Sequence, residues 1–153
     1  MTRGRPTRPQ FTKAAAADIR RLATTDRALA EMALRLAVRI HDGHVDGVPL
    51  NDRTKTGDLR DCYKAPFGHD PLNPTHRLVY RRVGAALEVV EVIAVGPRQD
   101  DAAYLMAGLR MDRITDPRRS LAERIVHRVL TRFSAPTDGP VSGLSESAQW
   151  VGR

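Results

Sequence analysis

The fold of this chain is decided by two adjacent stretches, HRLVYRRV from His76 to Val83 and LEVVEVIAV from Leu87 to Val95. Both are rich in β-branched residues, which suit the pleated, half-buried surface of a strand. Gly84 and Ala85 lie between them, and this spacing predicts a β-hairpin. Because the second stretch is apolar on both faces, we expect it to be a central strand, flanked by strands and covered by helices.

Two shorter segments extend this hairpin into a sheet. Leu59 to Lys64 is predicted to be a third strand, and Gln10 with Phe11 a short edge strand. The segment from Pro66 to Thr75 contains three prolines together with Gly68, and it is therefore predicted to be a loop.

The N-terminal part of the chain carries helical patterns. Thr12 is a suitable N-cap for a helix from Lys13 to about Leu22, and Asp26 can begin a second helix. In the second helix the apolar residues recur at helical spacing: Leu29, Met32, Ala33, Leu36 and Ile40. Gly43 is the expected stop. The short connection predicts a helical hairpin.

Two more helices are expected after the strands. The first should run from about Asp100 to Met111, with acidic residues at the end where the helix dipole favours them. The second follows Pro117, where Ser120 and Glu123 have the spacing of a capping box. The predicted class is therefore α+β, a small antiparallel sheet packed by an N-terminal helical hairpin and followed by C-terminal helices.

Length and composition set the domain organisation. The 153 residues suffice for one domain, which we expect over residues 10–133, with a flexible basic arm over 1–9 and a disordered tail over 134–153. The single cysteine, Cys62, excludes an intrachain disulfide framework. No apolar run suits a signal peptide or a membrane span, so a cytoplasmic protein with no membrane partner is expected. The net charge of +7 is compatible with a polyanionic partner, either nucleic acid or an acidic protein.

The functional signal is a set of cations around the predicted strands. Lys64, Arg77 and Arg98 come from three separate segments, Tyr104 follows on a helix, and no carboxylate cluster matches them. Residues two apart on a strand share a face, so Lys64 is expected near Arg77 and Arg81 of the neighbouring strand. Like charges on adjacent strands are destabilising, and such a set is easier to understand if an anion normally occupies it. An RNA phosphate fits that role.

The strings DCYK (Asp61–Lys64), RLVY (Arg77–Tyr80) and VGPR (Val95–Arg98), with Tyr104 beyond them, resemble the RelE branch of the small RelE/ParE-type bacterial toxins. The resemblance is strongest from Gly57 to Arg110. It implies the toxin component of a type II toxin–antitoxin system, an endoribonuclease that cleaves messenger RNA in the ribosomal decoding site. The implied partners are a co-expressed antitoxin protein that silences the toxin, the ribosome and the messenger RNA.

The resemblance also implies site residues. By position, Lys64 matches the first catalytic lysine, Arg77 the arginine that begins the RLVY strand, Arg98 the arginine after the Val-Gly turn, and Tyr104 the late aromatic residue. Pro66 departs from the family pattern, which has a second lysine there, and an insertion follows in place of a tight turn. The residues predicted to contact RNA are Arg60, His69, Arg81 and Arg110.

The implied reaction needs neither a metal ion nor a cofactor, because the ribose 2′-hydroxyl can attack the adjacent phosphorus and leave a 2′,3′-cyclic phosphate and a free 5′-hydroxyl. Arg77 would stabilise the charge that builds on the non-bridging oxygens. Arginine is a poor proton donor, so Arg98 would add charge stabilisation and donate only to a strongly basic leaving oxygen. Lys64 or Tyr104 would take the 2′ proton, or Tyr104 would stack on a base. His69 is an alternative proton carrier in place of the missing lysine.

Other interpretations stay open. A ParE-like toxin poisons DNA gyrase by protein contact, and there the cationic set is incidental. A non-catalytic member would only bind RNA or a protein, and Pro66 favours that interpretation. The residues also have ordinary explanations: Lys64 and Arg81 as solvated strand charges, Arg98 as a partner of Asp100 or Asp101, and Tyr104 as an interior aromatic residue.

Overall fold

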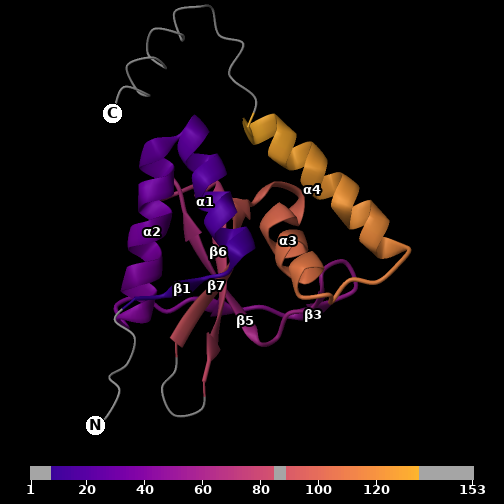
Figure 1. Cartoon of the computed structure of the whole chain (residues 1–153), viewed down its shortest axis with the longest axis horizontal. Helices are drawn as coiled ribbons and strands as arrows, with labels where there is room; N and C mark the ends of the chain where they lie inside the picture. Colours follow the sequence, from indigo (N-terminus) through magenta and orange to yellow (C-terminus); the bar gives the residue numbers. More distant parts are fainter. Residues whose placement is uncertain (1–7, 85–88, 135–153) are drawn as a thin grey trace, which may run out of the picture.

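The computed structural model describes residues 8–84 and 89–134 (Figure 1), so most of the predicted arm and tail lies outside the described residues. In chain order the elements are β1 (Gln10–Phe11), α1 (Lys13–Thr25), α2 (Arg27–His41), β2 (Val48–Pro49), β3 (Asp52–Arg53), β4 (Gly57–Asp58), β5 (Cys62–Phe67), β6 (His76–Val83), β7 (Val89–Pro97), η1 (Gln99–Asp101), α3 (Ala102–Arg110) and α4 (Arg118–Ser134). The predicted α+β class, with a helical hairpin before the sheet, is confirmed. Within the described ranges, every helix is too short or too polar to cross a membrane.

Five strands form one sheet in the order β1-β7-β6-β5-β2. The strands β5, β6 and β7 pair antiparallel, which confirms the predicted β6–β7 hairpin, although Ala85 in its connection lies outside the described residues. The edge strand β1 pairs with β7 in parallel, with Gln10 opposite Glu91, so the sheet is mixed rather than purely antiparallel. Parallel neighbours need a long connection, and here α1, α2 and the other strands lie between β1 and β7 in the chain.

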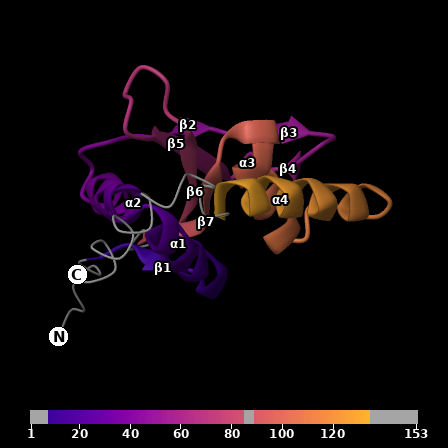
Figure 2. The same cartoon turned by 90° about the horizontal axis from the view of Figure 1, so that it is seen from above.

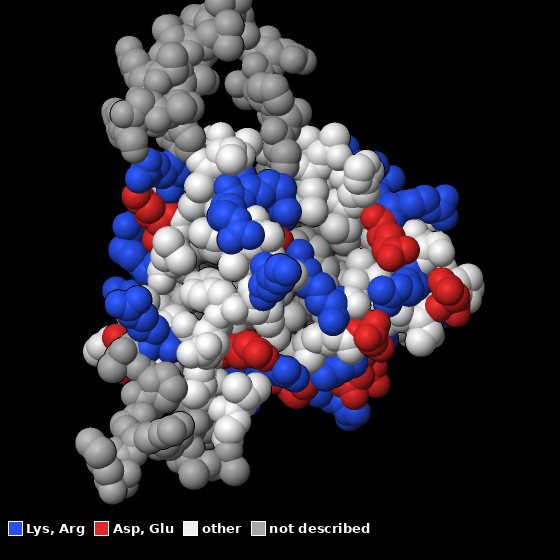
Figure 3. Space-filling view, in the orientation of Figure 1, with Lys and Arg blue, Asp and Glu red and all other residues white. Residues whose placement is uncertain are grey.

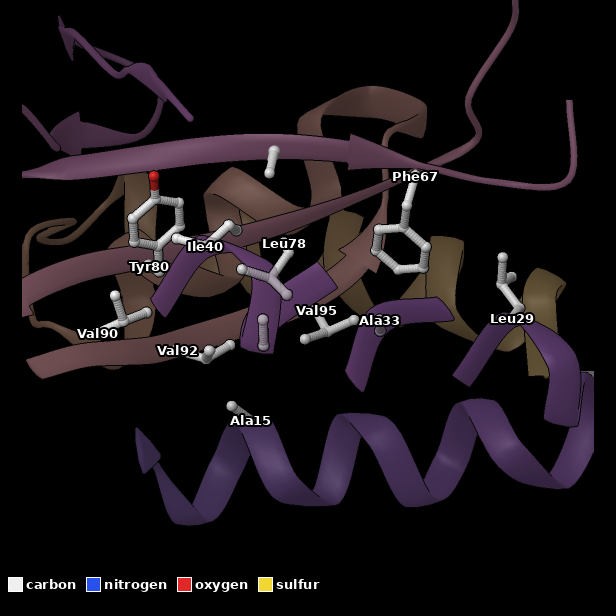
Figure 4. Packing of buried hydrophobic residues seen from close by; sticks show 12 residues of the cluster. Ala15, Leu29, Ala33, Ile40, Phe67, Leu78, Tyr80, Val90, Val92 and Val95 are labelled. Carbon is white, nitrogen blue, oxygen red and sulfur yellow. The ribbon is translucent and has the colours of Figure 1, made fainter. Parts of the chain in front are cut away.

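The helical hairpin covers one face of the sheet (Figure 2). Its buried cluster combines Leu78 of β6 and Val92 of β7 with Ala33 and Ile40 of α2 (Figure 4). Thr12 accepts a hydrogen bond from the N–H of Ala15, and Asp26 accepts one from the N–H of Leu29, both at 3.0 Å, which confirms the two predicted N-caps. The first helix runs to Thr25, beyond the predicted end.

The helices α3 and α4 lie on the opposite side of the sheet (Figure 2). Val79 and Ala94 pack against Tyr104 and Ala107 of α3. The outer side of α3 packs in turn against α4. The strand β7 is therefore covered on both faces and has strands on both sides, as its two apolar faces predict.

Both predicted ends of one strand and one predicted helix cap are wrong in detail. The strand predicted from Leu59 begins at Cys62, because the N–H of Cys62 closes a turn on the carbonyl of Leu59 at 2.9 Å. It also continues through Pro66, which was expected to begin a loop. The last helix begins at Arg118, directly after Pro117 as predicted, but Ser120 lies inside the helix and is not the N-cap that the predicted capping box requires.

A β-bulge interrupts the β6–β7 pairing. Val79 is opposite Ala94, whereas Tyr80 is opposite Val92, so Ile93 is the extra residue. Such a bulge locally disrupts the ladder of backbone hydrogen bonds. Val92 and Val95 consequently both face the helical hairpin, while Ile93 and Ala94 face α3.

Two charged side chains satisfy the backbone at this bulge. Asp18 of α1, 1% exposed, accepts a hydrogen bond from the N–H of Val95 at 2.9 Å. Arg110, at the end of α3, donates to the carbonyl of Ile93 at 3.1 Å and to both carboxylate oxygens of Asp18 at 2.6 and 2.8 Å. Arg21 adds a further bond to Asp18 at 2.8 Å. One buried carboxylate therefore joins α1, β7 and α3.

His76, at the start of β6, is a buried titratable group. It is 4% exposed and lies between the rings of Phe67 and Phe133, with centroid distances of 5.6 and 5.5 Å. Its Nδ1 lies 2.8 Å from the hydroxyl of Thr75. Burial is the chief cause that lowers the pKa of His76 to about 4.

Asp18→Asn should lower the free energy of unfolding by about 3–5 kcal/mol, because it removes the counter-charge of a largely buried guanidinium. Urea unfolding followed by circular dichroism measures the change. Glu31→Gln is the control, since Glu31 forms an exposed pair with Arg27 at 3.5 Å, and the change should stay below about 1 kcal/mol. Small, equal effects of the two substitutions would contradict the central role of Asp18.

The free energy of unfolding should fall as the pH falls from 6.5 to about 4, the ordinary and folded-state pKa values of His76. Between these two pH values His76 is protonated in the unfolded chain but stays neutral in the folded chain, so acid favours unfolding. The contribution is at most about 1.4 kcal/mol for each pH unit. Urea midpoints measured across this range should depend less on pH in His76→Gln, and an unchanged profile in that variant would count against the assignment.

Candidate functional site

Lys64 and Arg77 lie on the face of the sheet that α3 covers. In the β5–β6 pairing Lys64 is opposite Val79, and Arg77 is opposite Pro66, two positions further along. Residues on one face alternate along a strand, and Val79 packs against α3. Lys64 and Arg77 are therefore diagonal neighbours, a relation that separates two residues by roughly 7 Å.

Tyr104 lies in the first turn of α3, directly against Lys64. The Lys64 Nζ is 5.6 Å from the centroid of the tyrosine ring, which is a cation–π contact. Tyr104 is only 7% exposed and belongs to the cluster that contains Cys62 and Val79. The structure brings Lys64 and Tyr104 together, and it also shows Tyr104 to be an interior aromatic residue.

Arg77 is held at the edge of the same face by backbone carbonyls. Its Nη1 donates to the carbonyls of Pro74 and His76 at 3.2 and 2.9 Å. Its partner on β7 is Gly96, where a β-carbon would lie 2.7 Å from the sulfur of Met106 in α3. The glycine of the Val-Gly turn therefore allows α3 to approach the sheet beside Arg77.

Arg98 follows the end of β7, next to the same loop. Its N–H donates to the carbonyl of Thr75 at 2.8 Å, which continues the β6–β7 pairing beyond the last pair, His76 with Pro97. Its Nη1 donates to the side chain of Asn73 at 3.3 Å. In the described part of the chain, the alternative ion pair with Asp100 or Asp101 is not formed, because both carboxylates pair with other cations.

Lys64, Arg77 and Arg98 share one electrostatic property. Within residues 8–84 and 89–134, none of the three pairs with a carboxylate. Positive charge without a counter-charge attracts anions.

The carboxylates nearest to Lys64 in the chain are committed to arginines. Arg113 donates to both oxygens of Asp61 at 2.8 and 3.0 Å and lowers the pKa of that carboxyl. Arg60 donates to Asp58 and lowers the pKa of Asp58 to about 2. Neither carboxylate pairs with Lys64, although both belong to the segment that leads into β5.

The four residues predicted to contact RNA all have carboxylate partners instead. Arg60 pairs with Asp58, His69 with Asp26, Arg81 with Glu91 and Arg110 with Asp18, at N···O distances of 2.8, 2.7, 2.7 and 2.6 Å. His69 therefore lies against the junction of α1 and α2. A proton carrier for the reaction would have to lie beside Lys64 instead. The contacts of Arg110 are structural, because its partner is the buried carboxylate at the bulge.

Pro66 lies inside the candidate site. It is exposed and opposite Arg77, on the face that carries Lys64. Proline can carry no proton, so the departure from the family pattern removes a cation from this position. The insertion that follows supplies the carbonyl of Pro74 to Arg77 and the amide of Asn73 to Arg98. The loop therefore holds both arginines, which its sequence did not reveal.

Two further cations beside the site had no sequence signal. Arg53 and Lys55 belong to the polar β3–β4 ribbon, and both contact Asp101, immediately before α3. Their segment shows turn composition only, so nothing in it indicated a role. In the described part of the chain, no group of three or more His, Cys, Asp or Glu side chains could hold a metal ion.

Comparison of this chain with protein-family models, with curated proteins and with solved structures finds no match. The resemblance to the RelE branch stays a prediction, carried by the residues quoted above.

Cys62 should be unreactive in the folded protein. It is fully buried beside Asp61 and Met111, and burial raises the pKa of its thiol to about 12. Iodoacetamide at pH 8 should therefore label the cysteine only after unfolding in guanidinium chloride, as mass spectrometry can measure. Labelling of the folded protein at the rate of the unfolded chain would contradict this expectation.

Proposed function

We propose that this chain is a RelE-like toxin that cleaves messenger RNA on the ribosome without a metal ion. The observation that carries the proposal is the set of Lys64 on β5, Arg77 on β6 and Arg98 after β7, which have no carboxylate partners among the described residues. Like charges that converge in this way become favourable when an anion joins them. A phosphodiester is such an anion, and it matches the family motifs.

In the proposed reaction the RNA supplies its own nucleophile. The ribose 2′-oxygen forms a bond to the adjacent phosphorus, and the bond from phosphorus to the 5′-oxygen breaks. The 2′ proton passes to a base, and the departing 5′-oxygen takes up a proton from water, or from Arg98 where the oxygen is strongly basic. The protein has to position the linkage in line and to stabilise the charge on the non-bridging oxygens.

The geometry divides these tasks among the site residues. Arg77 and Arg98 are held by groups of the 68–75 loop and supply fixed donors for phosphate oxygens. Tyr104 is buried under the ammonium group of Lys64, so it is better placed to position Lys64 than to stack on a base. Lys64 is then the residue that we assign to the 2′ proton.

The proposed partners are the ribosome, its messenger RNA and a separately encoded antitoxin protein, with the cytoplasm as the compartment. The net charge of +7 supports a polyanionic partner. On the face seen in Figure 3, basic side chains gather over α1, whereas acidic and basic side chains interleave towards β3 and α4.

A second candidate is a non-catalytic family member that binds RNA or a partner protein. Pro66 favours it, because a proline occupies the position of the second family lysine opposite Arg77. A gyrase poison of the ParE type is the remaining alternative, and in it the cationic set has no role.

Arg77→Ala and Arg98→Ala should each reduce messenger cleavage by about 10²–10³, because each removes a donor to the developing charge. New 5′ ends on messenger RNA, mapped in a cell-free translation reaction, provide the measurement. Arg39→Ala is the matched control, since it removes the same charge from the exposed face of α2 and should leave cleavage unchanged. Circular dichroism should show all three variants folded.

A measurement of growth arrest in cells can contradict the nuclease proposal. If both arginine variants still arrest growth as strongly as the natural protein, without new 5′ ends in translated codons, the nuclease proposal is wrong and the binding or gyrase alternatives gain.

A further inference from the structure

A single carboxylate is clamped between two cations at the start of α3. Arg53 Nη2 and Lys55 Nζ both lie 3.3 Å from the same oxygen, Oδ2 of Asp101. The cations come from the β3–β4 ribbon, whereas Asp101 ends the turn η1. Two positive groups therefore share one negative group.

The side chain of Asp101 does not cap α3, although its place in the chain suggests that role. Asp101 is the N-cap residue of α3, but its side chain makes no capping hydrogen bond. Its backbone is left-handed, with φ 59°, and Asp100 before it is left-handed too, with φ 52°. Residues other than glycine adopt this conformation reluctantly. The turn thus delivers the carboxylate to Arg53 and Lys55 rather than to the N–H groups of the helix.

The ribbon is also fixed from the other side. Arg118, in the first turn of α4, donates to the carbonyl of Thr54 at 3.3 Å, between the two cations in the chain. The side chains of Arg53 and Lys55 remain 47% and 44% exposed, so the clamp is open to solvent.

The clamp lies next to the proposed catalytic set. The N–H of Asp101 donates to the carbonyl of Arg98 at 3.0 Å, and Tyr104, in the first turn of the helix that Asp101 precedes, contacts Lys64. A strand of RNA held at Lys64 and Arg98 therefore passes near Arg53 and Lys55 at an adjacent phosphate.

We propose that Arg53 and Lys55 form a second subsite for an RNA phosphodiester, and that the carboxylate of Asp101 occupies this subsite in the free protein. The inference rests on the proposed function and names a further contact of its substrate. An incoming phosphate takes the place of the carboxylate, so Asp101 weakens RNA binding by competition.

The test measures binding of a short fluorescein-labelled single-stranded RNA with 2′-O-methyl riboses, which cannot be cleaved by the proposed reaction. Asp101→Asn removes the competing charge, and asparagine tolerates the left-handed backbone. Binding should tighten by up to about fivefold, the upper limit set by an exposed ion pair. Arg53→Gln with Lys55→Gln should weaken binding and reduce the salt slope by about 0.7 for one lost phosphate contact.

Asp112→Asn is the matched control. Asp112 also has a left-handed backbone, with φ 56°, and pairs on the surface with Arg119 at 3.4 Å. The substitution changes the net charge by the same amount, yet it should leave RNA affinity nearly unchanged. In the Arg53→Gln, Lys55→Gln background, Asp101→Asn should have no further effect, because its competition acts through those two cations.

Each outcome decides the matter. The same variants are also measured for binding to ribosomes without messenger, and equal effects of Asp101→Asn and Asp112→Asn, or no effect of either, in both measurements would overturn the subsite. Tighter binding of the oligonucleotide assigns the phosphate to the messenger strand, and tighter binding only to ribosomes without messenger assigns it to ribosomal RNA. Both results support the subsite. Absence of messenger cleavage with the Asp101 effect intact would reject only the proposed nuclease activity.

Discussion

The rest of the structure depends on the hydrogen bonds that the buried carboxylate of Asp18 accepts. It accepts hydrogen bonds from Arg21, from Arg110 and from the N–H of Val95, so it ties α1 to the bulge in β7 and to the end of α3. A buried ion pair is not in itself a strong source of stability, because both groups lose water. Here the pair also accepts the N–H of Val95 and donates to the carbonyl of Ile93, which a pair of apolar side chains could not do.

The bulge decides which side chains face α3. Because Ile93 is inserted, the alternation of faces in β7 shifts by one residue after it, and Val95 returns to the side of the helical hairpin. Gly96 then faces Met106 of α3 and lies opposite Arg77. The close approach of α3 to Gly96, beside Arg77, thus follows from a local irregularity that α1 and α3 hold in place.

The charges of the molecule divide into two classes. Arg60, Arg81 and Arg110 have carboxylate partners, so their charge is largely neutralised within the protein. Lys64, Arg77 and Arg98 have none among the described residues; Lys64 and Arg77 are diagonal neighbours on β5 and β6, and Arg98 follows β7 beside the 68–75 loop. Charge left uncompensated at one place, rather than the total of +7, is the better guide to where an anion binds.

Local patterns in the sequence determined the β6–β7 hairpin, the N-caps Thr12 and Asp26, and the buried, two-faced character of β7, because each depends on residues a few positions apart. The sequence also indicated Lys64, Arg77, Arg98 and Tyr104 as a set. Only the tertiary structure decided that Ile93 is a bulge, that Arg110 belongs to Asp18, and that Asp101 lies between Arg53 and Lys55. Each of these features depends on contacts between residues that are far apart in the chain. The partner that a charged side chain finds depends on tertiary packing, which a local sequence pattern does not contain.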